Sequence, residues 1–441
     1  MANIDDRLFD QIFRLPALRR LELREDGPSG HFTMEGVYQR HPDSWLTQFR
    51  ERPEVEIVLK RGLAGDPALL KAMAPACNVT ELDWVKLDAK EAALVQQFPN
   101  LRRVHSREVT KEGLAALRGL PRLESLRVRV HPGQLGALQS VVHENGTLEV
   151  ELFQGEGEPE NVSDTTVLKS RALRWLQVGA GAMRGSAVDV PLGPNLRELF
   201  GDAEALSHLR LHDGIRHLKV RNGIGHRLAA QLGDASGLQR LTVQATAGVD
   251  EAFGRAVGNL RKLYELRILD EEDRPAGSDV LVPFLDGLPQ LVGLTLGGKD
   301  VTDTGLASFP ERPRMASLDL SGARVTNRGI MALPPMPELR TLRLARTLVD
   351  QRVVPFLVEN FPLLAVLELD GVALDLEHMN RLVALKHLSE VSFDATGVSW
   401  EEYQAFNCAT GGAASTGVET PERPDHPGPT TFVCTETYSG F

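Results

Sequence analysis

The phrase L-x-x-L-x-L returns about every two dozen residues along this chain. Its five clearest copies start at Leu291, Met315, Leu339, Leu364 and Leu388. The middle apolar residues of these copies, at 294, 318, 342, 367 and 391, are 24, 24, 25 and 24 residues apart. A fixed period in this range is typical of a solenoid, in which each unit packs only against its neighbours. Such a fold exposes a long repeated surface rather than one deep pocket, so binding is the function expected first.

Each copy contains the residues for a strand, a turn and a short helix. The L-x-L alternation places two leucines on one side of a strand and the residue between them on the other. A helix-starting phrase follows, as in Val301-Thr-Asp-Thr-Gly-Leu306 and Val325-Thr-Asn-Arg-Gly-Ile330. Thr302 and Thr326 are of a type whose side chain accepts a hydrogen bond at a helix start. Successive strands should therefore stack as a parallel sheet.

These phrases resemble leucine-rich repeats of about 24 residues, of the bacterial type and of the helix-bearing ribonuclease-inhibitor and F-box-associated classes. The resemblance implies an α/β solenoid with a curved parallel sheet on the concave side and short helices on the convex side. The usual Asn or Cys at the ninth repeat position is replaced here by Lys299, Ala323, Thr347, Val372 and Thr396. The side-chain ladder that this residue normally forms should be weak or replaced.

The repeats continue toward the N-terminus with more variation. Further copies are Leu263–Ile268, Leu238–Val243, Ile215–Val220, Leu196–Leu199, Leu173–Val178, Val150–Leu152, Leu123–Val128, Leu101–Val104, Leu82–Leu87, Val55–Leu59 and Leu18–Leu23. About fifteen units result. We expect an amphipathic cap at residues 1–16, irregular early repeats with an insertion at 17–97, and the regular solenoid at 98–406. Residues 407–441 should form a flexible tail, because they are rich in Gly, Thr and Pro and lack Leu and Ile.

Composition limits the setting in which this chain works. No stretch approaches the roughly 20 apolar residues that a membrane-spanning helix needs, and the start of the chain lacks a secretory signal pattern. Cys77, Cys408 and Cys434 are far apart and form no C-x-x-C motif, so no disulfide framework is expected. A reducing cytoplasm is the simplest location.

The residues between the strand leucines should form a binding surface on the concave side. In this register they include many arginines and two tryptophans, and Trp, Tyr and Arg are the usual anchors of protein interfaces. The candidate partner-binding residues are Trp84, Arg103, His105, Arg127, Arg129, Trp175, Lys219, Arg221, Arg267 and Arg343. A net charge of −11 disfavours a nucleic-acid partner. We therefore expect a protein partner with an acidic patch; the alternative is that these charges only keep the repeats soluble.

No short motif indicates catalysis, a cofactor or a metal. Gly293 to Lys299 matches G-x4-G-K, but Asp300 follows where a phosphate-binding loop needs Ser or Thr, and Gly293 should lie within a strand. His208 and His212 have i, i+4 spacing, yet they should lie in a loop beside a strand. The leading hypothesis is a non-catalytic protein-interaction scaffold.

Two alternatives remain open. The tail could be the substrate of a modifying enzyme that the repeats dock, with Cys408, Thr431, Cys434, Thr435 and Thr437 as the modified residues. A small-GTPase regulator is the third possibility, and it rests on fold analogy alone.

The repeat register also predicts which side chains are buried. Leu318, Leu342 and Leu367 should be fully buried, because they occupy the inward position of three successive strands. The residues that follow them, Asp319, Arg343 and Glu368, should be exposed on the other face of the sheet.

Overall fold

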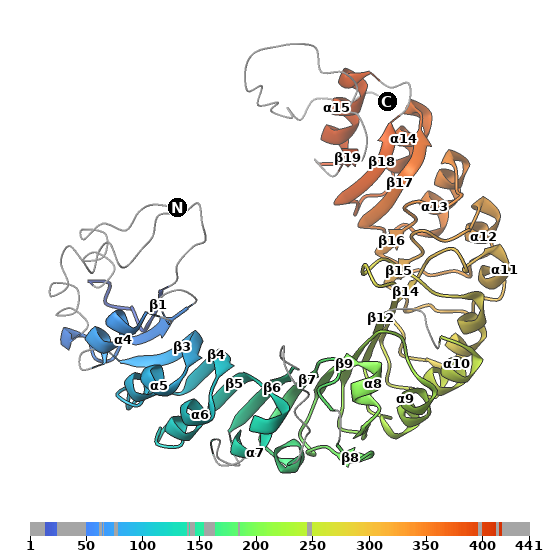
Figure 1. The fold of residues 1–441 in the computed structure, drawn as a ribbon. Helices are drawn as coiled ribbons and strands as arrows, with labels where there is room; N and C mark the ends of the chain where they lie inside the picture. Colours follow the sequence, from blue (N-terminus) through green and yellow to red (C-terminus); the bar gives the residue numbers. More distant parts are fainter. Residues whose placement is uncertain are drawn as a thin grey trace. The chain divides into compact units, whose positions relative to one another are not determined.

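The computed structural model describes residues 14–23, 50–60, 64, 66–74, 78–138, 141, 146–153, 164–183, 186–244, 249–395, 399–411 and 414–416 (Figure 1). The chain divides into two compact units, Met1–Ile215 and Arg216–Phe441. Each unit is a repeating series of strands and short helices.

Unit 1 has one parallel sheet whose strands are adjacent in chain order. The strands are β1 (Arg20–Leu23), β2 (Glu56–Leu59), β3 (Val79–Leu87), β4 (Arg103–Val109), β5 (Ser125–Val130), β6 (Thr147–Leu152), β7 (Leu173–Val178) and β9 (Glu198–Asp202). The helical segments are α4 (Pro67–Met73), α5 (Ala89–Val95), α6 (Lys111–Leu117), η2 (Pro132–Gln134), α7 (Leu135–Leu138), η3 (Thr166–Lys169) and α8 (Ala203–Leu206). A separate short pair joins β8 (Val190–Pro191) to β10 (Leu209–Arg210).

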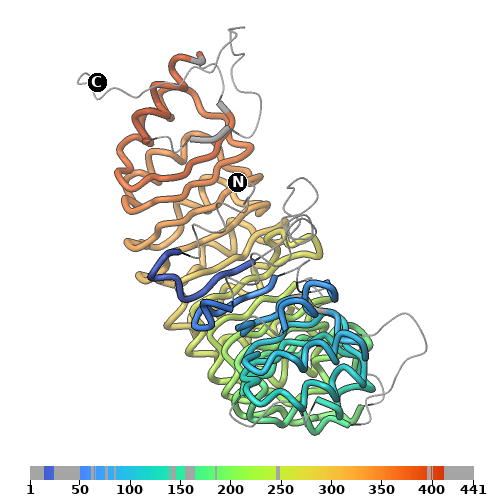
Figure 2. Tube along the Cα trace, turned by 90° about the vertical axis from the view of Figure 1, so that its left-hand side faces the viewer, coloured from blue at the N-terminus to red at the C-terminus, as the bar shows by residue number. Residues whose placement is uncertain are grey.

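Unit 2 repeats this plan with a second run of parallel strands. They are β11 (His217–Arg221), β12 (Arg240–Gln244), β13 (Glu265–Leu269), β14 (Gly293–Leu296), β15 (Ser317–Asp319), β16 (Thr341–Arg343), β17 (Val366–Leu374), β18 (Glu390–Ala395) and β19 (Ala414–Thr416). The helical segments are α9 (His226–Gln231), η4 (Leu232–Asp234), α10 (Glu251–Gly258), η5 (Asp279–Gly287), α11 (Asp303–Leu306), α12 (Asn327–Met331), η6 (Gln351–Val353), α13 (Val354–Asn360), α14 (Leu376–Leu382) and α15 (Trp400–Ala409). Figure 2 shows successive turns of this unit stacked in chain order.

The core of each unit lies between the strands and the helices, and the expected leucine register is confirmed. Leu318 is in register with Leu342, and Leu342 with Leu367; all three side chains are fully buried. The expectation for the opposite face was wrong at Asp319, whose side chain is only 9% exposed. Its Oδ1 accepts hydrogen bonds from the backbone N–H and the hydroxyl of Ser321, so the carboxylate folds onto its own turn. Arg343 and Glu368 are half-buried, because they pair with each other.

A ladder at the helix starts replaces the missing ninth-position ladder. The first residue of one helix bonds to the residue before the next helix, one repeat further along. Asp279 Oδ1 accepts from the Thr302 N–H at 2.9 Å, and Asp303 Oδ1 from the Thr326 N–H at 2.7 Å. The threonine hydroxyls donate to the second carboxylate oxygens, both at 2.6 Å. These bonds satisfy N–H groups that a helix start leaves free.

The same ladder continues with different side chains. Asn327 Oδ1 accepts from the Asp350 N–H at 3.0 Å, and Gln351 Oε1 accepts from the Asp375 N–H at 3.2 Å. Hydrogen bonds from Arg352 and Asn327 hold the pKa of the Asp350 carboxyl well below its ordinary value. The helix-start ladder therefore links five successive repeats of unit 2.

The expected ends of the chain have different outcomes. Most of the cap predicted at residues 1–16, and the insertion between β1 and β2, lie outside the described residues. The tail expected from residue 407 is structured at its start, since α15 extends to Ala409 and β19 pairs with β18 in parallel. Residues 417–441 are outside the described part of the chain. No helix among the described residues is long and apolar enough to cross a membrane.

Candidate partner-binding surface

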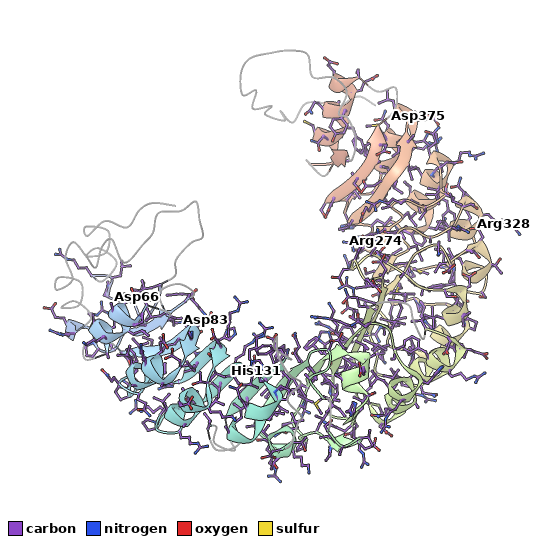
Figure 3. All side chains as sticks on the ribbon, in the orientation of Figure 1. Asp66, Asp83, His131, Arg274, Arg328 and Asp375 are labelled. Atoms are coloured by element: carbon purple, nitrogen blue, oxygen red, sulfur yellow. The ribbon has the colours of Figure 1, made fainter. Side chains whose placement is uncertain are left out.

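The strand face of each unit is the side of its sheet opposite the helices, which leave it uncovered (Figure 1). In Figure 3, Arg274 of unit 2 lies on the strand side and Arg328 on the helix side. The expected partner-binding residues lie on the strands of this face. Five are described in unit 1: Arg103, His105, Arg127, Arg129 and Trp175. Four belong to unit 2: Lys219, Arg221, Arg267 and Arg343. The Trp84 side chain lies outside the described part of the chain.

Glu81 is the centre of an ion-pair cluster at the start of unit 1. Its carboxylate is 3.0 Å from Arg20 Nη2, 2.9 Å from Lys60 Nζ and 2.7 Å from Arg103 Nε. Burial alone would raise the pKa of Glu81, but the hydrogen bonds from Lys60 and Arg103 hold it below its usual range. Asp83 extends the cluster, with Lys60 Nζ at 3.1 Å and His105 Nδ1 at 2.6 Å. Burial lowers the pKa of His105, although Asp83 opposes this.

Replacing Glu81 with glutamine should lower the free energy of unfolding by about 1–2 kcal/mol at neutral pH, because Arg20 and Arg103 lose the Glu81 carboxylate and Lys60 keeps only Asp83. The carboxyl pKa is depressed in the folded state, so its contribution is present above the unfolded value of about 4.3 and is lost as pH falls through the folded pKa. Thermal melting between pH 3 and pH 7 should show the gap to the unsubstituted protein closing below about pH 4. Glu124→Gln, an exposed carboxylate 3.5 Å from Arg102, is the control and should change little.

Carboxylates on neighbouring strands also meet the arginines of β5. Arg127 Nε lies 3.5 Å from Glu149 Oε2, and Arg129 Nε lies 3.2 Å from Glu151 Oε1. These residues are direct neighbours in the parallel register of β5 and β6. The basic stretch predicted for unit 1 is therefore largely balanced by acidic side chains, and its net charge alone does not define a partner.

The strand face of unit 1 also carries a group of aromatic side chains beside these ion pairs. The Trp175 and Phe200 ring centroids are 5.7 Å apart, and the Arg127 guanidinium lies 4.8 Å from the Trp175 ring centroid. Arg129 lies 4.1 Å from the Phe153 ring in the same way. A small pocket of about 140 Å³ lies beside this cluster. Its lining comprises His105, Ser106, Arg107, Arg127, Val128, Arg129 and Glu151. We call Arg127, Trp175 and Phe200 the aromatic cluster.

The first strands of unit 2 hold basic side chains that have no close carboxylate partner among the described residues. Arg221 and Arg267 are exposed, and their side chains form no hydrogen bond or ion pair with a described residue. Lys219 is only loosely paired, since its Nζ is 3.8 Å from Asp273. Arg267 also lines a hollow of about 220 Å³ together with Tyr264 and Glu265. A carboxylate on a partner could therefore approach this part of the strand face.

The later strands of unit 2 border a cleft of about 430 Å³. The segment after β13 forms one wall, where Asp270 and Arg274 pair at 2.7 Å. The charged groups of the lining are Asp270, Arg274, Asp319, Arg343, Arg346, Glu368 and Asp370. We call this hollow the mixed-charge cleft. The sequence did not predict this cleft, although it placed Asp319 and Glu368 on this face.

Arg346, which lines this cleft, has an unusual backbone conformation. Its φ is +55°, in the left-handed region that side chains other than glycine rarely adopt. The same turn in the two preceding repeats carries glycine, Gly298 with φ +83° and Gly322 with φ +73°. A residue held in such a conformation costs of order 1 kcal/mol or more and is common at functional sites.

The structure does not support a modification site or a metal site at the candidate residues that it describes. Cys408 lies in α15 and is disulfide-bonded, although no disulfide framework was expected from the three widely spaced cysteines. Thr431, Cys434, Thr435 and Thr437 are outside the described residues. His212 Nδ1 accepts from the Gly214 N–H at 3.0 Å, and His208 Nδ1 is 3.3 Å from the Ser186 hydroxyl. Within the described ranges, no three His, Cys, Asp or Glu side chains gather as metal ligands would.

Comparison with known proteins gives matches only among solved structures; no family model and no curated protein matches. An internalin (inlF) from Listeria monocytogenes is 14% identical, over 88% of this chain and 94% of that one, with a TM-score of 0.42. A chain of the yeast Rad7–Elc1 complex is 13% identical, over 77% and 84%, with a TM-score of 0.40. A chain of the mouse RP105/MD-1 complex is 12% identical, over 82% and 78%, with a TM-score of 0.38.

The fold class follows from the chain's own repeats. Strand, turn and short helix recur at about 24 residues, the strands are parallel and in register, and the leucines of successive repeats stack in the core. The chain is a leucine-rich repeat solenoid.

Proposed function

We propose that this protein is a non-catalytic interaction scaffold that holds a protein partner on its strand faces. The observation that carries the proposal is the aromatic cluster of unit 1, where Arg127 stacks on Trp175 and Trp175 packs against Phe200. None of the three side chains is fully buried. A tryptophan beside an arginine on an open sheet is the composition typical of an interface hot spot.

The proposal keeps the partner expected from the sequence, a protein with an acidic patch. The residues proposed to contact that patch are different from those expected. The ion pairs of β3–β6 leave little uncompensated positive charge in unit 1. Arg221 and Arg267 in unit 2 retain theirs, so they are the proposed contacts for the carboxylates of the partner. Such charges act mainly on the rate of association, whereas the aromatic cluster contributes to the lifetime of the complex.

Trp175→Ala should weaken binding of the native partner by about 2 kcal/mol, which is roughly thirtyfold. The double substitution Arg221→Glu and Arg267→Glu should slow association and reduce its dependence on salt. The measurement is affinity capture from the native host with quantitative mass spectrometry, followed by binding kinetics with the protein that is captured. Arg328→Glu, an exposed residue on the helix side, is the control (Figure 3). Capture of the same proteins in equal amounts by all variants would show that the strand faces are not the interface.

A further inference from the structure

The mixed-charge cleft of unit 2 has more carboxylates than cations that can meet them. Arg274 is engaged by Asp270 at 2.7 Å and by Glu272 at 2.9 Å, and Arg343 by Glu368 at 2.9 Å. These pairs leave Asp319 and Asp370 without a cation among the described residues. Burial raises the pKa of Glu368, and Asp370 and Asp319 add to this although Arg343 opposes it. An added cation in the cleft would relieve this repulsion.

One carboxylate of the cleft lining, Asp370, also has an oxygen atom that accepts no hydrogen bond. Asp370 Oδ1 is shielded from solvent and has no hydrogen-bond partner among the described residues. Ser392 Oγ and Asp394 Oδ1 of the next strand also have no partner among the described residues, but neither residue lines the cleft, and Asp394 is in register with Ala373. Buried polar atoms are nearly always hydrogen-bonded, so a shielded carboxylate oxygen without a donor is costly. A ligand with several N–H donors and a positive charge would satisfy this oxygen atom of Asp370.

We propose that the mixed-charge cleft receives an arginine side chain from a protein partner. A guanidinium presents five N–H donors in a planar fork that matches carboxylates, whereas an ammonium is a compact point charge. A volume of about 430 Å³ lies in the range of pockets that hold ligands. This inference rests on the proposed scaffold function and names a chemical feature of the partner.

A substitution at Arg346 tests the proposal by an expected gain in binding rather than a loss. Its exposed guanidinium borders the cleft, so it repels a cation that enters. Glycine in its place keeps the fold, because Gly298 and Gly322 occupy the equivalent turns of the two preceding repeats. Arg346→Gly should therefore tighten the binding of a basic probe, whereas a substitution that merely disturbs the cleft would weaken it.

The experiment uses the full chain and two small probes, N-acetyl-arginine methylamide and its neutral isostere N-acetyl-citrulline methylamide. Saturation-transfer NMR titration suits the weak binding expected for probes of this size. The arginine probe should bind at least tenfold more tightly than the citrulline probe. Asp370→Asn, which preserves the shape of the side chain, should remove most of that difference, and Arg346→Gly should increase it severalfold. Asp234→Asn, an exposed carboxyl of η4, is the control and should leave it unchanged.

Equal binding of the two probes, or a preference for arginine that survives Asp370→Asn, would overturn the proposal. Thermal melting of each variant shows that the fold persists. The test needs no native partner, so its failure is distinct from failure of the scaffold function. Capture that depends on Trp175 with no arginine preference would leave the aromatic cluster as the interface and exclude the cleft. An arginine preference together with capture that does not depend on Trp175 would support the cleft and exclude the aromatic cluster as the interface.

Discussion

Gly329→Ala should destabilise the protein by about 2–4 kcal/mol, although alanine normally favours a helix over glycine by about 1 kcal/mol. Gly329 is the third residue of α12, and a methyl group there would lie 2.2 Å from Asp303 Oδ1. That oxygen belongs to the helix-start ladder, where it accepts from the Thr326 N–H. The substitution therefore has to displace the carboxylate, which breaks two hydrogen bonds and leaves the Thr326 N–H unsatisfied.

Two controls separate this clash from a general effect of alanine. Gly233 in η4 has open space where its methyl group would lie, so Gly233→Ala should be neutral or slightly stabilising. Asp303→Ala removes the carboxylate, and the pair Asp303→Ala with Gly329→Ala should cost clearly less than the sum of the single substitutions. Urea unfolding followed by circular dichroism measures these free energies. Additive effects would show that the glycine and the carboxylate do not compete for space.

The positions of the strands could be predicted from the sequence, because the L-x-L alternation and its period fix both the strand and its buried face. Even the divergent copies at Val55–Leu59 and Val150–Leu152 correspond to β2 and β6. The ladder at the helix starts was only half predicted. Thr302 and Thr326 were identified as capping residues, and both cap their helices, but each also bonds to the carboxylate of the preceding repeat. That bond depends on stacking, which a single repeat does not show.

The charges of the strand face show why the candidate site was harder to predict. Sorting them along the chain by sign suggested a basic surface, whereas the sheet places Arg127 beside Glu149, which is 22 residues away. Neighbours in a parallel sheet lie one repeat apart, so the pairs follow only after the register is applied. One feature of the sequence does indicate the mixed-charge cleft. The interval from Leu266 to Leu294 is 28 residues rather than about 24, because the segment after β13 that forms one wall of the cleft is inserted there.

Leu342→Asp should have the largest effect of any change discussed, at about 4 kcal/mol or more. Leu342 is fully buried in β16, in register with two other buried leucines. Among the described residues, this layer of the core contains no cation that could pair with a new carboxylate. The aspartate must either be buried with its charge or take up a proton, and both reduce stability. Because each repeat is stabilised by its neighbours, hydrogen exchange should accelerate in β15 and β17 as well as in β16.

The matched control is the same substitution six residues later, at a leucine of the same repeat. Leu348 is 62% exposed, so Leu348→Asp should change the free energy of unfolding by no more than about 0.5 kcal/mol. Thermal and urea unfolding of the two variants test the prediction side by side. A melting temperature for Leu342→Asp equal to that of Leu348→Asp would mean that the 342 side chain does not point into the core. The alternation on which the whole repeat register depends would then be wrong for this strand, and with it the placement of Arg343 and Glu368 on the strand face.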